Sequence, residues 1–236
     1  MWFCFPSDEF RPRCESYSAD AVVKRRGTVK NNVWTMVHAE RAALIDDLTH
    51  LDDEQWETPS LCDGWTVHDV AAHLVASART TRLGFTVGLV RARLDFHRYN
   101  ARGVQRERGA SPRETLARLR QVAPRRSTPP APLDSRFVEE IVHGEDIRRP
   151  LGLAHSYPQD AVVRSLRLQA RTPASIGGAK ELVTGLRLVG TDVDLSIGDG
   201  PEVNGTALSL LLAISGRRVA PDELHGPGTA TLAAAT

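Results

Sequence analysis

Apolar residues recur every three or four positions over much of the first 150 residues, which is the period of amphipathic helices. Residues 33–48 follow this pattern and predict a first helix. Residues 67–78 predict a second helix, in which the hydroxyl of Thr66 and the carboxylate of Asp69 form an N-terminal capping pair. His73 lies beside the apolar face of this second helix rather than opposite it.

Three further segments continue the helical pattern. A third helical region is expected over residues 86–99, and a shorter helix begins at Ser111, where Ser-Pro-Arg-Glu supplies a cap, a proline and an early glutamate. Residues 124–132 contain four prolines and are expected to be a loop. A final helix of this group begins at Asp134 or Ser135. The first part of the chain therefore predicts a helical bundle.

The pattern changes in the last third of the chain. Residues 160–171 are expected to form another helix. Residues 185–190 and 193–198 alternate apolar with polar positions and predict two strands joined by a tight turn. The apolar run over residues 206–214 predicts a helix that Gly216 ends. The C-terminal third is therefore expected to be a small α+β module beside the bundle.

These changes in pattern suggest three parts. Residues 1–35 lack a sustained period and are expected to be a disordered extension. Residues 36–157 are expected to form the helical bundle, and residues 158–236 the small α+β domain. The predicted fold class is mainly α.

Composition narrows the function classes. The 236 residues are 41% hydrophobic and 25% charged, which is typical of a globular protein, and the formal net charge of +1 gives no indication of nucleic acid as a partner. We find neither a membrane-spanning run nor a signal peptide, and expect no membrane partner. Three cysteines without paired spacing fit a reducing compartment, so a cytoplasmic location is expected.

The clearest chemical signal is a stripe of polar residues on the helix that follows residue 134. Glu139, His143 and Asp146 are spaced four and three apart, which places them on one helix face. An imidazole and a carboxylate on one face can bind a divalent metal if a third ligand comes from elsewhere, and His73 is the candidate. Taken alone, Glu139 and His143 are by default an ordinary surface ion pair or satisfied neighbours on the helix.

Other nearby residues are weaker candidates for metal binding or catalysis. Glu140 and Glu145 are rivals of Glu139, although neither shares the face of His143 as closely. His68 points away from His73, so the two are not expected to bind one metal. Cys62 has no base nearby in the sequence, and a structural role is expected for it.

Three sequence runs resemble parts of a known family. Trp56 with the run Pro-Ser-Leu-Cys-Asp-Gly-Trp-Thr-Val-His-Asp-Val-Ala-Ala-His-Leu resembles the N-terminal signature of the mycothiol-dependent maleylpyruvate isomerase family. Glu-Glu-Ile-Val-His-Gly-Glu-Asp-Ile-Arg-Arg-Pro-Leu-Gly is similar to its second signature. The run Asp-Leu-Ser-Ile-Gly-Asp-Gly-Pro-Glu-Val-Asn-Gly is similar to its small C-terminal domain. The resemblance covers residues 36–234.

The resemblance implies a DinB-like four-helix bundle that binds one divalent metal, with zinc expected, through two histidines and a glutamate. Carried over by position, these metal ligands are His73, Glu139 and His143. Asp146 is then a supporting residue rather than a ligand. The C-terminal module would be a sterol-carrier-like α+β domain that helps to close over the substrate.

The resemblance also implies the chemistry. Mycothiol would be the thiol cosubstrate, adding to the cis double bond of maleylpyruvate, permitting rotation and then departing. Relatives of this bundle transfer such thiols to other electrophiles, so the expected function is a metal-dependent isomerase or S-transferase with a small-molecule thiol and a small electrophile as partners. Two alternatives remain open, a non-catalytic metal-binding protein and a protein that binds a small apolar ligand on the same scaffold.

Overall fold

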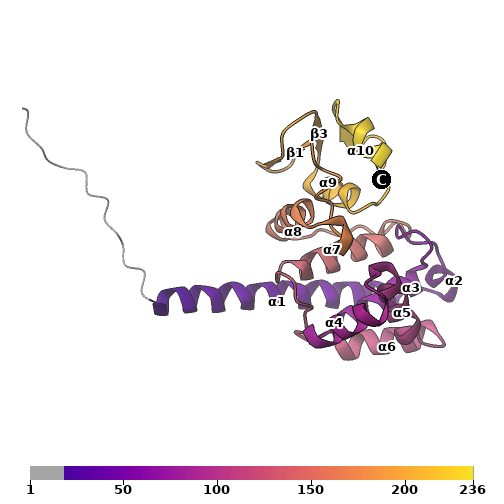
Figure 1. Ribbon diagram of the computed structural model, residues 1–236. Coiled ribbons are helices and arrows are strands. Elements are labelled where there is room, and N and C mark those ends of the chain that lie inside the picture. Colours follow the sequence, from indigo (N-terminus) through magenta and orange to yellow (C-terminus); the bar gives the residue numbers. More distant parts are fainter. Residues whose placement is uncertain (1–18, 236) are drawn as a thin grey trace, which may run out of the picture.

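The computed structural model describes residues 19–235, and helices account for most of them (Figure 1). The helices are α1 (Ala19–Thr49), α2 (Asp53–Trp56), α3 (Val67–Arg79), α4 (Arg82–Arg91), α5 (Phe96–Glu107), α6 (Pro112–Val122), α7 (Ser135–Arg148), α8 (Gln159–Arg171), the 3₁₀ helix η1 (Ala174–Ile176), α9 (Ala207–Ile214) and α10 (Thr229–Ala235). The strands are β1 (Arg187–Gly190), β2 (Ser196–Ile197), β3 (Glu202–Gly205) and β4 (Leu224–His225). The fold is therefore mainly α, as the sequence predicts.

The bundle is organised around α3, which packs against α5, α6 and α7, while α1 packs against α6 and α7. One apolar core fills the space between these helices. Its fully buried members include Leu48 of α1, Val70 of α3, Leu119 of α6 and Ile147 of α7. Since α3 and α7 touch in the centre of this arrangement, side chains on their facing sides can meet.

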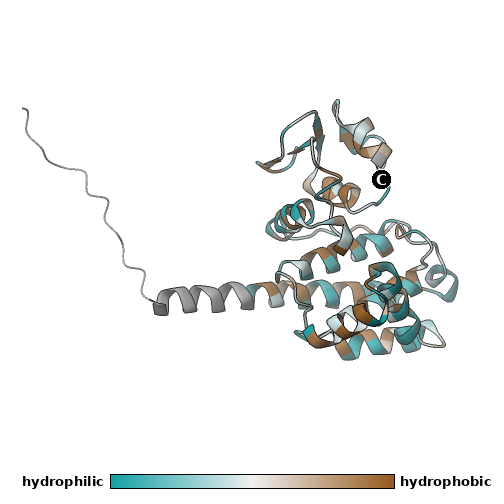
Figure 2. Ribbon diagram, viewed as in Figure 1, coloured by the Kyte–Doolittle hydropathy of each residue, from teal (hydrophilic) through white to brown (hydrophobic). Residues whose placement is uncertain are grey.

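A second core joins α7 to the C-terminal module. It contains the apolar face of α8, the run Leu210 to Leu212 of α9, and Leu188 and Val203 of the sheet. In Figures 1 and 2, α9 is mostly hydrophobic and lies between α8 and the strands. Helix α8 in turn packs against α7. No helix within residues 19–235 combines the length and apolar composition needed to cross a bilayer.

The small sheet has the order β2-β1-β3-β4. The first two strands are antiparallel, as the tight turn predicts, with Leu188 opposite Ile197. The strand β1 also pairs in parallel with β3, and β3 pairs antiparallel with β4. The strands β3 and β4 were not predicted from the sequence.

Two predicted helix starts are confirmed. The hydroxyl of Thr66 accepts a hydrogen bond from the backbone N–H of Asp69, and the Asp69 carboxylate accepts one from the backbone N–H of Thr66. The hydroxyl of Ser111 likewise accepts a hydrogen bond from the N–H of Glu114 at the start of α6. The first of these caps fixes the start of the helix that carries His73.

The single helix expected over residues 86–99 is wrong, because the chain turns sharply within it. The helix α4 ends at Arg91, and Arg93 and Leu94 take φ angles of +60° and +62°, which a helix excludes. Asp95 then caps α5 by accepting a hydrogen bond from the N–H of Arg98. Left-handed residues other than glycine give little sequence signal, so the break was not predicted.

Helix α1 runs across the domain boundary expected at residue 36. Helix α1 begins at Ala19, and Val33 and Trp34, which precede the expected boundary, are buried in the second core. Their partners come from α7 and later parts of the chain, so a local period does not reveal them. The expectation of disorder for residues 1–18 lies outside the described residues.

Candidate metal centre

Three predicted ligands meet where α3 crosses α7. His73 comes from α3, Glu139 and His143 come from α7, and one ligand atom from each lies within 4.8 Å of the other two. The imidazole rings of His73 and His143 are edge to face, with centroids 4.5 Å apart. Four-residue spacing places Glu139 and His143 one helical turn apart, so both side chains reach the same facing residue on α3. The structure thus brings together all three residues.

The Glu139 carboxylate lies in a mostly buried position with few hydrogen bonds. Its Oε1 atom is 2.8 Å from Nε2 of His73, yet this buried oxygen has no partner with hydrogen-bond geometry among the described residues. Its Oε2 atom lies 3.7 Å from Nη2 of Arg136. Burying a carboxylate oxygen without a partner costs free energy, and a bound cation would remove that cost.

The protonation of these groups suits a cation. Burial would raise the pKa of Glu139, but neighbouring His73 and Arg136 together hold that pKa well below its ordinary value. Burial lowers the pKa of His73 and outweighs the opposing effect of Glu139. An ionised carboxylate and a neutral imidazole are the forms that bind metals.

A carboxylate behind His143 fixes its ring. The Nδ1–H of His143 donates a hydrogen bond of 2.8 Å to Oδ2 of Asp146, which leaves Nε2 as the free nitrogen. Asp146 is fully buried and also accepts hydrogen bonds of 2.9 and 2.7 Å from Nε and Nη2 of Arg217. Burial would raise the pKa of Asp146, but these donors lower it below its ordinary value. Metal-binding histidines are oriented by carboxylates in the same manner.

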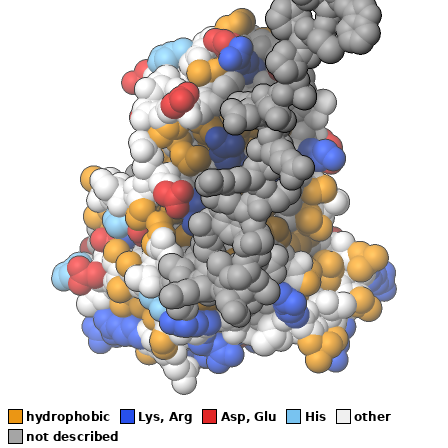
Figure 3. Space-filling model, turned by 90° about the vertical axis from the view of Figure 1, so that its left-hand side faces the viewer, with side chains coloured by type: hydrophobic (Ala, Val, Ile, Leu, Met, Phe, Trp, Pro, Cys, Tyr) orange, Lys and Arg blue, Asp and Glu red, His pale blue; other side chains and the backbone are white. Residues whose placement is uncertain are grey.

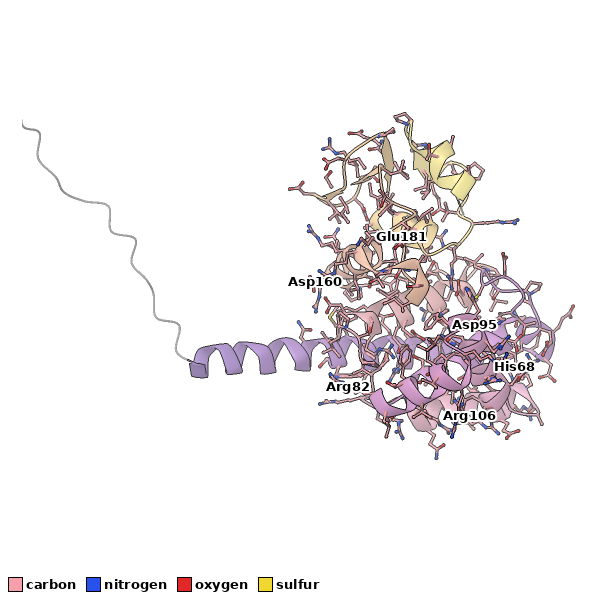
Figure 4. The ribbon with its side chains drawn as sticks, viewed as in Figure 1. His68, Arg82, Asp95, Arg106, Asp160 and Glu181 are labelled. Carbon is pink, nitrogen blue, oxygen red and sulfur yellow. The ribbon has the colours of Figure 1, made fainter. Side chains whose placement is uncertain are left out.

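The competing residues point elsewhere. Glu140 pairs with Arg41 of α1 at 2.8 Å, and Glu145 pairs with Arg149 at 2.8 Å. His68 is buried at the opposite side of α3, where its Nε2 lies 2.7 Å from the hydroxyl of Thr115. Figure 4 shows His68 within the bundle and away from the C-terminal module. None of the three belongs to the cluster.

A cavity of about 400 Å³ opens beside the cluster. His73, Glu139 and Arg136 lie at its inner end, and α4 and α5 supply much of its wall. A volume of this size is typical of small-molecule sites. The cluster is therefore reachable by a ligand of moderate size.

Two arginines near the cluster were missed from the sequence. Arg217 follows the end of α9 and reaches α7 through a contact over 71 positions, which no local pattern indicates. Arg136 precedes Glu139 by one helical turn, and that spacing is a signal that could have been used. Arg79 also lines the cavity, whereas Arg82 and Arg148 do not.

The residues present fit a divalent metal. Two imidazoles and one carboxylate are a common catalytic zinc set, and three protein ligands leave a position for a further ligand. A tetrahedral zinc site with ligand distances of about 2.1 Å separates its donor atoms by about 3.4 Å. The donor atoms here lie within 4.8 Å of each other, so small side-chain rotations suffice to reach that geometry.

Comparisons with known proteins agree with the fold. Residues 37–136 match the family model of the mycothiol maleylpyruvate isomerase N-terminal domain, a match that includes His73 and Arg136. A crystal structure of a histidine-to-alanine mutant of a mycothiol-dependent maleylpyruvate isomerase aligns with a TM-score of 0.60 and 14% identity, over 84% of this chain and 92% of that one. A second crystal structure of a mycothiol-dependent maleylpyruvate isomerase aligns with a TM-score of 0.55 and 16% identity, over the same shares. No curated protein matches the chain significantly.

Proposed function

We propose that the protein is a metal-dependent, thiol-using enzyme, because residues 37–136 match the family model of the mycothiol maleylpyruvate isomerase N-terminal domain. Its cosubstrate would be mycothiol, and its reaction an isomerisation of the maleylpyruvate type or the transfer of the thiol to a small electrophile. The proposed metal ligands are His73, Glu139 and His143, with zinc as the expected metal. The solved isomerases share the fold at 14–16% identity, and this likeness does not extend to their substrate.

One observation carries the proposal. The buried Oε1 atom of Glu139 lies 2.8 Å from Nε2 of His73 and close to His143, and it has no partner of good hydrogen-bond geometry among the described residues. A purely structural ion pair would be expected to form hydrogen bonds of good geometry here, because an unsatisfied buried carboxylate is costly. The arrangement therefore supports the proposal that these residues are ligands around an open position.

The residues around the proposed ligands have separate roles. A divalent metal bound there would lower the pKa of a thiol in the open position, so that a thiolate forms near neutral pH. Asp146 holds the ring of His143 in one tautomer, because a carboxylate accepts only from a protonated Nδ1. Arg217 in turn holds Asp146 and ties the C-terminal module to α7. Trp65 lies against His73, with ring centroids 5.2 Å apart, and excludes water from one side of that ligand.

The proposed reaction needs no oxidant. In the isomerisation, the thiolate sulphur forms a bond to one alkene carbon, and the π electrons move to the conjugated carbonyl oxygen. The remaining single bond rotates, the double bond forms again and the thiolate leaves. In a transfer reaction, the carbon–sulphur bond is kept and a leaving group or a proton completes the balance.

Metal analysis and thiol-dependent turnover together test the proposal. Purified full-length protein should contain one zinc per chain, and His73→Ala and Glu139→Ala should each lose it. Wild-type protein should either isomerise maleylpyruvate only when mycothiol is present or consume mycothiol with an electrophile from a broad panel, and His73→Ala should do neither. Absence of bound metal would refute the metal centre, and the protein would then be a binding scaffold.

Bound zinc without thiol-dependent turnover across the panel would instead refute the enzyme and favour a metal-binding protein without catalysis. Isomerisation of maleylpyruvate that returns the thiol separates an isomerase from a transferase, because a transferase consumes the thiol in proportion to product. The two measurements therefore distinguish the classes that the sequence alone leaves open.

A further inference from the structure

The cavity has two chemically different regions. Its inner end is polar and contains Arg136 next to the metal ligands His73 and Glu139. Its outer wall is built by α4 and α5, which contribute three aromatic rings. The proposed thiol chemistry accounts for the ligands and leaves Arg136 and the aromatic wall without a role.

Arg136 is a buried cation with incomplete hydrogen bonding. Its side chain is 3% exposed, and Nη1 donates a hydrogen bond of 3.0 Å to the hydroxyl of Ser77. Its Nε atom is buried without a hydrogen-bond partner among the described residues. The nearest carboxylate oxygen belongs to Glu139, at 3.7 Å, and would also be needed by a metal. A guanidinium in this state favours binding of a carboxylate from a ligand.

Other arginines that line the cavity differ from Arg136. The side chains of Arg79 and Arg106 share Glu107, at 2.7 and 2.9 Å, so an acid already balances much of their charge. Arg91 and Arg102 are exposed, which makes them weaker anion sites. Figure 3 shows basic and apolar side chains interspersed over the lower part of the molecule, at the height of α4 and α6 in Figure 1. Among the described arginines that line the cavity, only Arg136 combines burial with an unused donor.

The outer wall is aromatic. Phe85 of α4 lies edge to face with Tyr99 of α5, with ring centroids 5.2 Å apart, and Phe96 lies 6.3 Å from Tyr99. Gly88 allows this packing, because a Cβ atom there would lie 2.6 Å from the Tyr99 ring. All three rings are only half buried, so part of their surface remains available to a ligand.

We propose that the electrophilic substrate carries both a carboxylate and an apolar or aromatic group. Arg136 binds the carboxylate beside the metal ligands, and Phe85, Phe96 and Tyr99 hold the apolar group. This inference rests on the proposed function and specifies the substrate class of the same site. The two regions line one cavity, so a single molecule can occupy both.

The test measures binding of three unreacted probes to the zinc-loaded full-length protein by calorimetry, without any thiol. The probe trans-cinnamate has a carboxylate and a ring, cinnamamide has the ring without the charge, and maleate has carboxylates without a ring. We expect cinnamate to bind about tenfold more tightly than either of the others. Equal binding of cinnamamide would overturn the role of Arg136, and equal binding of maleate would overturn the role of the aromatic wall.

Substitutions test which residues account for the difference in binding between the probes. Arg136→Gln should weaken cinnamate binding about tenfold and leave cinnamamide binding unchanged, since a hydrogen-bonded charge is lost. Arg79→Gln is the matched control, because Arg79 lines the same cavity but pairs with Glu107, and it should change cinnamate binding less than about twofold. Phe85→Ala should weaken both cinnamate and cinnamamide. Equal losses in Arg136→Gln and Arg79→Gln would show that only the general positive field attracts the anion, and would refute the site.

Failure of this inference can be told apart from misfolding of a variant and from failure of the proposed function. The probe comparison uses the wild-type protein, so it stands even where Arg136→Gln fails to fold. Cinnamate bound directly to zinc would keep its affinity in Arg136→Gln, which would also refute the site. If the protein binds zinc and consumes mycothiol but does not discriminate among the probes, the proposed function stands and this inference fails.

Discussion

Arg217 and Asp146 form a buried pair in which the guanidinium donates to both carboxylate oxygens, at 2.9 and 2.7 Å. The same carboxylate accepts a hydrogen bond from His143. The pair therefore connects the C-terminal module to one of the proposed metal ligands. Removing one member of a buried charged pair leaves the other uncompensated.

Asp146→Asn should therefore affect both stability and metal binding. We expect a loss of about 3–5 kcal/mol in the free energy of unfolding, because Arg217 loses its buried partner. Zinc affinity should fall about 10- to 100-fold, because His143 is no longer held by a carboxylate. Urea denaturation and competition with a chelator measure the two effects.

Asp134→Asn is the control for this substitution. Asp134 also pairs with an arginine, Arg164, at 2.5 Å, but the pair is partly exposed and neither residue belongs to the cluster of proposed ligands. It should cost at most about 1 kcal/mol and leave zinc affinity unchanged. Equal effects of the two substitutions on zinc affinity would contradict an orienting role for Asp146.

His73→Ala and His68→Ala form a matched pair on the same helix. Both histidines are buried, but only His73 lies in the cluster, whereas His68 contacts Thr115. His73→Ala should reduce zinc affinity by more than about 100-fold, since it removes a ligand rather than a supporting residue. His68→Ala should retain one zinc per chain.

Zinc removal gives a second readout for these variants. A chelator should lower the melting temperature of wild-type protein and of His68→Ala, because a ligand that binds only the folded state at 100 times its Kd stabilises it by about 2.7 kcal/mol. The melting temperature of His73→Ala should not respond. A chelator response in His73→Ala would place the metal elsewhere.

Cys62 should be an unreactive thiol. It is partly buried, and burial is the main reason that its pKa rises to about 11 from the ordinary 9.0, while Asp146 and Asp63 add to the rise and Arg217 opposes it. The folded state therefore holds the protonated thiol, so its stabilising contribution is present below pH 9 and is lost as the pH rises from 9 towards 11. The thiolate is the reactive form, so alkylation at pH 9 should be more than about tenfold slower in the folded protein than in urea.

The measurement uses a variant in which Cys4 and Cys14 are replaced by serine, so that Cys62 is the remaining thiol. Mass spectrometry follows iodoacetamide labelling over time at several pH values. Labelling as fast in the folded as in the unfolded state would contradict a raised pKa and reopen a nucleophilic role for Cys62.

Trp34 should contribute strongly to stability, although it precedes the domain boundary that the sequence suggests. Its side chain is 2% exposed and belongs to the core shared by α1, α7 and the C-terminal module. Trp34→Ala should lower the free energy of unfolding by about 3–5 kcal/mol. Asn32→Ala, at an exposed position of the same helix, should change it by less than about 0.5 kcal/mol. Similar values for both in urea denaturation would restore the boundary at residue 36.

The sequence predicted the parts of this fold that local chemistry determines. Capping groups such as Thr66 and Ser111 act over one helical turn, so their helices begin where expected. The ligand stripe on α7 was predictable for the same reason, because Glu139 and His143 are one turn apart. Long-range contacts were not predictable from one sequence: the burial of Trp34 and the contact between Arg217 and Asp146 each depend on residues far along the chain.

The left-handed turn at Arg93 and Leu94 was missed for a different reason. Its φ angles are unfavourable for these residue types, and backbone hydrogen bonds from the N–H of Arg93 to Val90 and from the N–H of Leu94 to Leu89 hold the turn. The break matters because it folds α4 back beside α5 and so forms the aromatic wall of the cavity.

The helix α4 lines the cavity, yet none of its residues is buried, and it packs mainly on α5. Segments with few buried apolar contacts open locally at a small free-energy cost, independently of global unfolding. Hydrogen exchange of the α4 amides should therefore be fast compared with that of α3 and α7. Entry and release of small molecules at the inner end of the cavity would then depend on fluctuations of α4, while the two hydrophobic cores around the proposed metal ligands remain folded.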